Sequence, residues 1–208
     1  MNSELIITLD WLKEHGASDE YLNQFKSTLL KDKEGIEVSQ ALKNENLSMN
    51  IWLVDKLPFN STPLEVDKIW DTLFYNGDVY VKGNVITNSL VYIKGDLITD
   101  EGIIINEVSE ISAKHINAKN IVLSGESIIT GEIKAKNIYL SEYAIIKGDI
   151  EAVKVNMCNL ASIVGNVTTE TIKMHDQTNV DGDIFATSVM IKDGSVTGNI
   201  KSKTLLRI

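Results

Sequence analysis

The chain has 208 residues and a net charge of −9, and it is long enough for one large domain or two small ones. Its single arginine is Arg207, whereas nucleic-acid-binding proteins cluster arginine and lysine, so we expect neither nucleic acid nor an anionic membrane surface as a partner. The single cysteine, Cys158, cannot form an internal disulfide, and no apolar run is long enough for an integral membrane segment, so the composition favours a cytoplasmic location.

Residues 1–72 show helical periodicity and hold seven lysines against thirteen acidic residues. Met1–Glu4 lacks the basic segment that begins a signal peptide. We therefore predict a small, acidic, all-α domain over residues 1–72. Its expected helices are one through Leu12 that ends at Gly16, one capped by Ser18, one at 38–43, one that starts near Ser48 and ends before Pro58, and one opened by Thr62-Pro63 that runs through Trp70.

From Ala113 to Ile208 the sequence repeats about every seventeen residues. Each repeat ends on a glycine, a polar residue and an aliphatic residue, as in Gly148-Asp149-Ile150. Earlier motifs of this kind extend the pattern back to about residue 73 in imperfect register. Apolar residues fall into columns, of which two read Ile116, Ile133, Ile150, Val167, Ile184, Ile200 and Ile121, Ile138, Val155, Ile172, Val189, Leu205.

The spacing within one repeat predicts short strands. Inward candidates come in pairs two residues apart, as Ile133 and Ala135 do, and this separation places both side chains on one face of a strand. Three such pairs per repeat, separated by glycine and polar corners, predict a mostly-β domain, a parallel β-helix of about seven coils over residues 73–208. Because the ends of a solenoid expose core and strand edges, we expect the domain of residues 1–72 to cap one end.

The recurring Gly-Asp-Ile unit, followed by Ala-x-x-(Val/Ile)-x-(Ile/Leu/Met) in the same register, resembles the bactofilin family of bacterial polymer-forming cytoskeletal proteins. The resemblance covers roughly residues 77–208. It implies a right-handed, triangular β-helix that polymerises end to end without a nucleotide. The helical domain in front departs from the short, flexible tails that are usual in the family.

We find no arrangement of residues that predicts catalysis. His115 and His175 occupy outward or corner positions without a second ligand at metal spacing. Cys158 has no neighbouring base that would activate its thiol. We therefore expect no catalytic residue, no metal and no cofactor. A left-handed β-helix acyltransferase is disfavoured, because its strict hexapeptide spacing fails once in each repeat.

One column of acidic residues supports an alternative function. Glu132, Asp149 and Asp183 occupy equivalent positions in the repeats, and polysaccharide lyases built on parallel β-helices use acidic clusters that hold calcium. Asn166 and Asn199 interrupt this column and dilute its charge. We therefore favour a structural ladder at a corner, and a carbohydrate-active or carbohydrate-binding β-helix stays open.

The C-terminal segment 204–208 is the predicted self-association site. Leu205 completes an apolar column, and Leu206 and Ile208 follow it without a polar helix or charged cap. The last coil would thus expose a strand edge and apolar side chains that a second copy could cover. We predict a non-enzymatic scaffold protein that forms a dimer or filament through these residues. The alternative is a dimeric adaptor whose acidic helical domain binds a protein partner.

Overall fold

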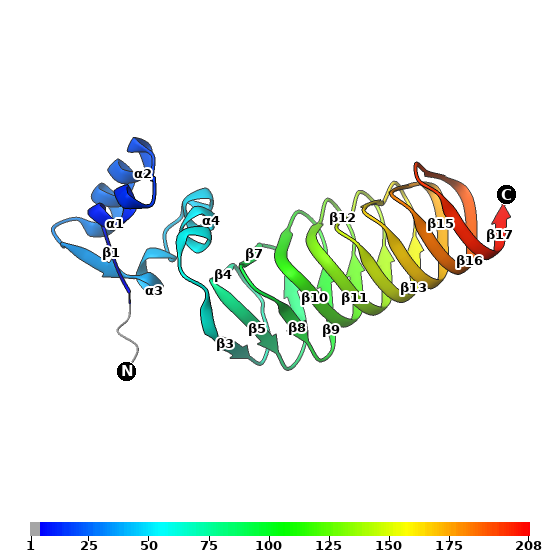
Figure 1. Ribbon diagram of the computed structural model, residues 1–208, viewed down its shortest axis with the longest axis horizontal. Coiled ribbons are helices and arrows are strands. Elements are labelled where there is room, and N and C mark those ends of the chain that lie inside the picture. The colour runs from blue at the N-terminus through cyan, green and yellow to red at the C-terminus, as the bar shows by residue number, and fades with distance from the viewer. Residues whose placement is uncertain (1–4) are drawn as a thin grey trace. The chain divides into compact units, whose positions relative to one another are not determined.

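The computed structural model describes residues 5–208 (Figure 1). The chain divides into two compact units, which we call the helical unit (residues 1–58) and the solenoid (residues 59–208). The first strand of the solenoid therefore lies before the domain boundary that we expected after residue 72. Met1–Glu4, in which we expect no signal peptide, lies outside the described residues.

Four short α-helices dominate the helical unit, in agreement with the sequence pattern. Ser18 caps its helix as predicted, and its side chain accepts a hydrogen bond from the Tyr21 N–H at 3.2 Å. No helix within residues 5–208 is both long and apolar enough to cross a membrane. The elements are β1 (Ile6–Thr8), α1 (Leu9–Glu14), α2 (Asp19–Gln24), the π-helix η1 (Phe25–Leu30), β2 (Gly35–Glu37), α3 (Val38–Ala41) and α4 (Leu47–Lys56).

The solenoid is a parallel β-structure of about 9 turns, and strands make up 55% of the chain. The predicted β-helix is therefore confirmed. The strands are β3 (Asn60–Val66), β4 (Leu73–Tyr75), β5 (Gly77–Val81), β6 (Val85–Thr87), β7 (Leu90–Ile93), β8 (Leu97–Thr99), β9 (Gly102–Ile105), β10 (Glu110–Leu123), β11 (Ile128–Leu140), β12 (Ile145–Lys147), β13 (Ile150–Met157), β14 (Ser162–Val164), β15 (Val167–Asp181), β16 (Ile184–Val196) and β17 (Ile200–Arg207).

The predicted columns are the real register of the solenoid. Ile133 pairs with Ile116 in the preceding coil and with Ile150 in the following one, and Ile138 likewise lies between Ile121 and Val155. These side chains are almost fully buried and belong to one continuous core. Stacking like residues on like therefore buries each column in one continuous core.

Glycine is required at the corner before the first strand of each regular coil. At Gly148 the backbone has a φ of +147°, and a Cβ atom there would lie 2.1 Å from the carbonyl oxygen of Gly131 in the preceding coil. A side chain would collide with that carbonyl group and would strain the backbone. The repeated glycine thus allows consecutive coils to approach closely at this corner.

Two expectations about the start of the solenoid are wrong. The segment after Thr62-Pro63 is not a helix, because β3 occupies it and pairs in parallel with β5. The extended backbone lets Leu64 and Val66 pack against the solenoid core, and proline is tolerated in an edge strand. The solenoid also has about 9 turns rather than about seven, and one of the additional turns is this first coil, which lacks the glycine motif.

Candidate functional site

Strand β17 forms the C-terminal edge of the solenoid (Figure 1). It pairs in parallel with β16 from Ile200 to Arg207, and the Ile208 N–H donates to the Ile191 carbonyl at 3.1 Å. Because backbone groups alternate in direction along a strand, those of Arg207 and Leu205 point away from β16. No strand of residues 5–208 pairs with that side of β17.

The side chains of the predicted self-association site lie on different sides of this strand. Leu205 continues the buried column of Val189, which is 0% exposed, yet Leu205 itself is 47% exposed. Leu206 stacks on Met190 and faces outward, with 44% of its surface exposed. Ile208 follows the strand and is 71% exposed. The exposed core position is thus Leu205, while Leu206 extends an outer column.

A shallow hollow of about 400 Å³ lies beside this edge. It is lined in part by Thr178, Gly194, Arg207 and Ile208. The side chain of Arg207 occupies the column of Ile191, which is a core position in the coil before it. A cationic group therefore stands at the end of an otherwise apolar column.

The opposite edge of the solenoid is β3, and its first residues are held by side chains of the same coil. The Asn60 side chain accepts a hydrogen bond from the Thr62 N–H at 3.0 Å, and the Tyr75 hydroxyl donates to the Thr62 carbonyl at 2.7 Å. Partial burial raises the pKa of the Tyr75 hydroxyl, while its hydrogen bond from Asn60 acts in the opposite direction. Sequence reasoning missed this edge, because Thr62-Pro63 also fits the start of a helix.

The acidic column forms a structural ladder. Asp149 accepts a hydrogen bond from the Asn166 N–H at 2.7 Å, and Asn166 accepts one from the Asp183 N–H at 2.9 Å. Asp183 in turn accepts one from the Asn199 N–H at 2.7 Å. Each side chain thereby satisfies a backbone donor of the next coil, which an asparagine can do as well as an aspartate. The alternation of aspartate and asparagine in this column is therefore the pattern expected of a structural ladder at a corner.

His115 lies in the same column, in the coil before Glu132. Its Nδ1 atom lies 2.7 Å from the Asp96 carboxylate and its Nε2 atom lies 3.6 Å from the Glu132 carboxylate. The two carboxylates thus contact opposite nitrogens and do not converge on one point. Residues 5–208 contain no group of three side chains that could hold a metal ion.

Cys158 lies at a corner with its sulfur 3.8 Å from the Leu140 carbonyl oxygen. Burial raises the pKa of its thiol, and the nearby charges of Asp176 and Glu142 act in the same direction. A raised thiol pKa lowers the fraction of reactive thiolate at neutral pH. The surroundings of Cys158 therefore do not favour nucleophilic chemistry.

Comparison with known proteins supports the family that the repeat resembles. No curated protein and no solved structure matches the chain. Residues 69–168 match the Bactofilin family, described as polymer-forming cytoskeletal. This segment runs from the first coil of the solenoid into β15. The predicted resemblance is therefore confirmed over these residues: this part of the solenoid is similar to the bactofilin domain, whose family is described as polymer-forming and cytoskeletal.

Proposed function

We propose that the chain is a non-enzymatic structural protein that self-associates through the C-terminal edge of its solenoid. The observation that carries the proposal is the free side of β17, where Leu205 holds a core position but is 47% exposed. The polymer-forming description of the matching family supports it. We further propose a cytoplasmic location, which the cytoskeletal description of that family supports.

The edge offers two kinds of stabilisation to a second copy. Outward backbone groups of β17 can continue the parallel ladder of the solenoid, and each new hydrogen bond contributes about 1 kcal/mol. Covering the exposed half of Leu205 contributes about 1 kcal/mol more, since full burial of a leucine is worth roughly 1.5–3 kcal/mol. Both contributions favour association, and they must together exceed the cost of lost translational and rotational freedom, about 4–15 kcal/mol.

The test is sedimentation velocity of the full chain and of the Leu205→Asp variant across a range of concentrations. We expect the variant to associate at least about tenfold more weakly, because the contact would bury an unpaired carboxylate. The matched control is Val153→Asp, which changes a residue of similar exposure, 42%, away from either edge. Equal association of Leu205→Asp and the unmodified chain would refute a role for this edge.

A further inference from the structure

A row of apolar side chains lies exposed along one corner of the solenoid. Tyr143 and Leu160 occupy equivalent positions in consecutive coils, because the residues two positions after them pair with each other. Val108 occupies the same position two coils before Tyr143. The exposed fractions are 71% for Val108, 59% for Tyr143 and 44% for Leu160. We call this set of equivalent residues the corner row, and its members are Val108, Glu126, Tyr143, Leu160 and Gln177.

The fold itself does not require the apolar residues of the corner row. Tyr143 and Leu160 belong to neither of the two core clusters. The backbone of Leu160 has a φ of +66°, a conformation that leucine disfavours and that asparagine tolerates. Ile145, two residues after Tyr143, and Ile128, which pairs with Ile145, are partly exposed and widen the apolar surface. An exposed apolar surface that includes a leucine in a strained conformation indicates contact with another molecule.

The charge around the corner row is uniformly negative. The row and the residue before it in each coil include no lysine and no arginine. They include four exposed acidic residues, and none of the four forms an ion pair within residues 5–208. Burial is the main cause of the raised pKa of the neighbouring Cys158 thiol, and the charges of Asp176 and Glu142 add to it. The four acidic residues are Glu107, Glu126, Glu142 and Asp176.

The spacing of the corner row matches the pitch of an α-helix. Consecutive coils are about 4.8 Å apart, and consecutive turns of an α-helix rise by about 5.4 Å. A helix along this corner would therefore present one turn to each coil, with a mismatch of only about 2 Å between Val108 and Leu160. The apolar stripe of an amphipathic helix could then cover the exposed apolar residues, and cations beside the stripe would lie near the acidic residues.

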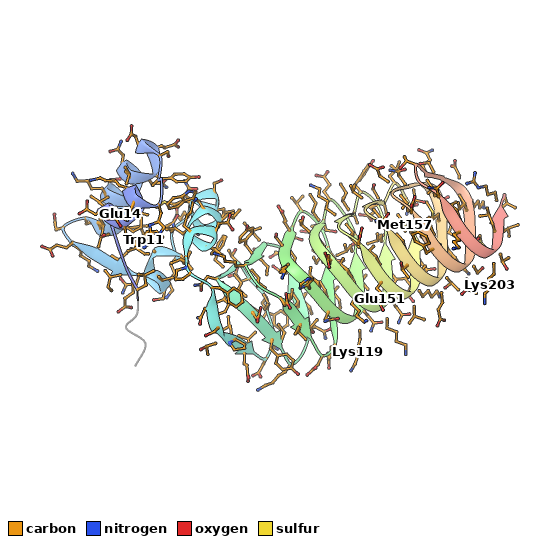
Figure 2. All side chains as sticks on the ribbon, in the orientation of Figure 1. Trp11, Glu14, Lys119, Glu151, Met157 and Lys203 are labelled. Carbon is orange, nitrogen blue, oxygen red and sulfur yellow. The ribbon has the colours of Figure 1, made fainter. Side chains whose placement is uncertain are left out.

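The two candidate occupants within this chain do not fit this charge. The helical unit holds ten acidic residues and six lysines, so its charge opposes contact with an acidic surface. Another corner of the solenoid carries Lys119, which lies at the outer margin in Figure 2, and Lys136. Glu170 occupies the same column as these two lysines, so the charge of that corner is mixed. The corner row is therefore better matched by a cationic segment of a different protein.

We propose that the corner row is a docking site for a cationic amphipathic helix of another protein, whose apolar stripe covers Tyr143 and Leu160. Glu126 lies one coil before Tyr143 and Asp176 lies one coil after the residue that precedes Leu160, so acidic groups flank both ends of this apolar contact. The site lies along the side of the solenoid. The proposal therefore does not depend on self-association through β17.

A synthetic peptide tests the proposal on the full chain. The probe is a fluorescently labelled peptide of about 15 residues, with leucines in one helical stripe and lysines at the other positions. The control peptide has the same composition in an order that leaves no apolar stripe. Fluorescence anisotropy measures binding of both peptides. We expect the control peptide to bind at least about tenfold more weakly than the probe, because it cannot align its leucines with the corner row.

Two variants separate the apolar contribution from the charged one. Tyr143→Ser with Leu160→Asn should weaken binding of the probe at least about tenfold, because two apolar contacts are lost. The matched control is Val153→Asn, which changes a residue of 42% exposure on another corner and should leave binding unchanged. Glu126→Gln with Asp176→Asn should weaken binding about threefold and reduce its salt dependence, whereas Glu170→Gln should do neither. Circular dichroism checks that every variant is folded.

The remaining outcomes would overturn the proposal. These are no binding of the probe below about 1 mM, equal binding of the control peptide, and unchanged affinity of the folded variant with Tyr143→Ser and Leu160→Asn. Sedimentation velocity of that variant without peptide examines the other occupant. Altered association of the chain would show that the corner row contacts a second copy, and it would overturn docking of a different protein.

Glu142 is left unchanged in these variants, because its carboxylate accepts a hydrogen bond from the Gly125 N–H at 2.7 Å. A change at this position would alter the corner itself as well as its charge.

Discussion

Two threonines on β15 allow a matched test of how the core tolerates polar groups. Thr178 is 0% exposed and its hydroxyl has no hydrogen-bond partner among the described residues. Thr169 is 7% exposed, and its hydroxyl donates to the Val153 carbonyl at 3.0 Å. Valine has the shape of threonine without the hydroxyl, so the same substitution removes an unpaired group at one position and a bonded group at the other.

We expect Thr178→Val to raise the free energy of unfolding by about 1–2 kcal/mol. A buried hydroxyl without a partner costs roughly 1–3 kcal/mol, because it is hydrogen-bonded to water only in the unfolded chain. Thr169→Val should instead lower the free energy of unfolding by about 1 kcal/mol, since it removes the bond to the Val153 carbonyl. Neither change alters the side-chain volume appreciably.

Urea unfolding followed by circular dichroism measures both effects as shifts of the midpoint at constant slope. All variants are compared at the same protein concentration, so that association contributes equally. A loss of stability in Thr178→Val equal to that in Thr169→Val would refute the reasoning, because it would mean that the Thr178 hydroxyl is satisfied. Ser127→Ala offers a second case, since Ser127 is also 0% exposed and its hydroxyl has no partner among the described residues.

Two further substitutions test the corners. Gly148→Ala should lower the free energy of unfolding by at least about 2 kcal/mol, because its Cβ atom would lie 2.1 Å from the Gly131 carbonyl oxygen; an unchanged urea midpoint would contradict this. Leu160 has a φ of +66° and is 44% exposed, and leucine is disfavoured in that conformation by roughly 1–2 kcal/mol whereas asparagine tolerates it. Leu160→Asn should therefore raise the free energy of unfolding by about 1 kcal/mol, and a lower midpoint in the same assay would show that the leucine side chain makes a stabilising contact.

The regular coils were predictable because a period-two pattern, repeated every seventeen residues, leaves one arrangement that buries every apolar column. The pairing of Ile133 with Ile116 and Ile150 follows directly from that period. The first coil was not predictable in this way. It has no glycine motif, and the proline in Thr62-Pro63 is favourable both at the first position of a helix and in an edge strand.

The same ambiguity hid the fact that β3 and β17 are equivalent edge strands. Residues 64–71 and 200–207 can be compared in the sequence only once β3 is known to be a strand of the solenoid. In the helical unit, β1 and β2 have 3 residues each, and strands of that length give no periodicity. The π-helix η1 follows α2 directly, and its apolar residues do not distinguish it from a continued α-helix.

The regular coils pair with one another in the same register. The length of the solenoid can therefore change without a change in the residues at its edges. Ile150 meets Ile133 as Val167 meets Ile150, so each of these coils presents the same surface to the coil before and the coil after. Removing or adding one whole repeat between Gly131 and Gly182 would leave β3, β17 and their neighbours unchanged. The distance between the edges can thus vary in steps of one strand spacing, about 4.8 Å. Evolution can therefore lengthen or shorten the solenoid by whole repeats without changing the residues at either edge.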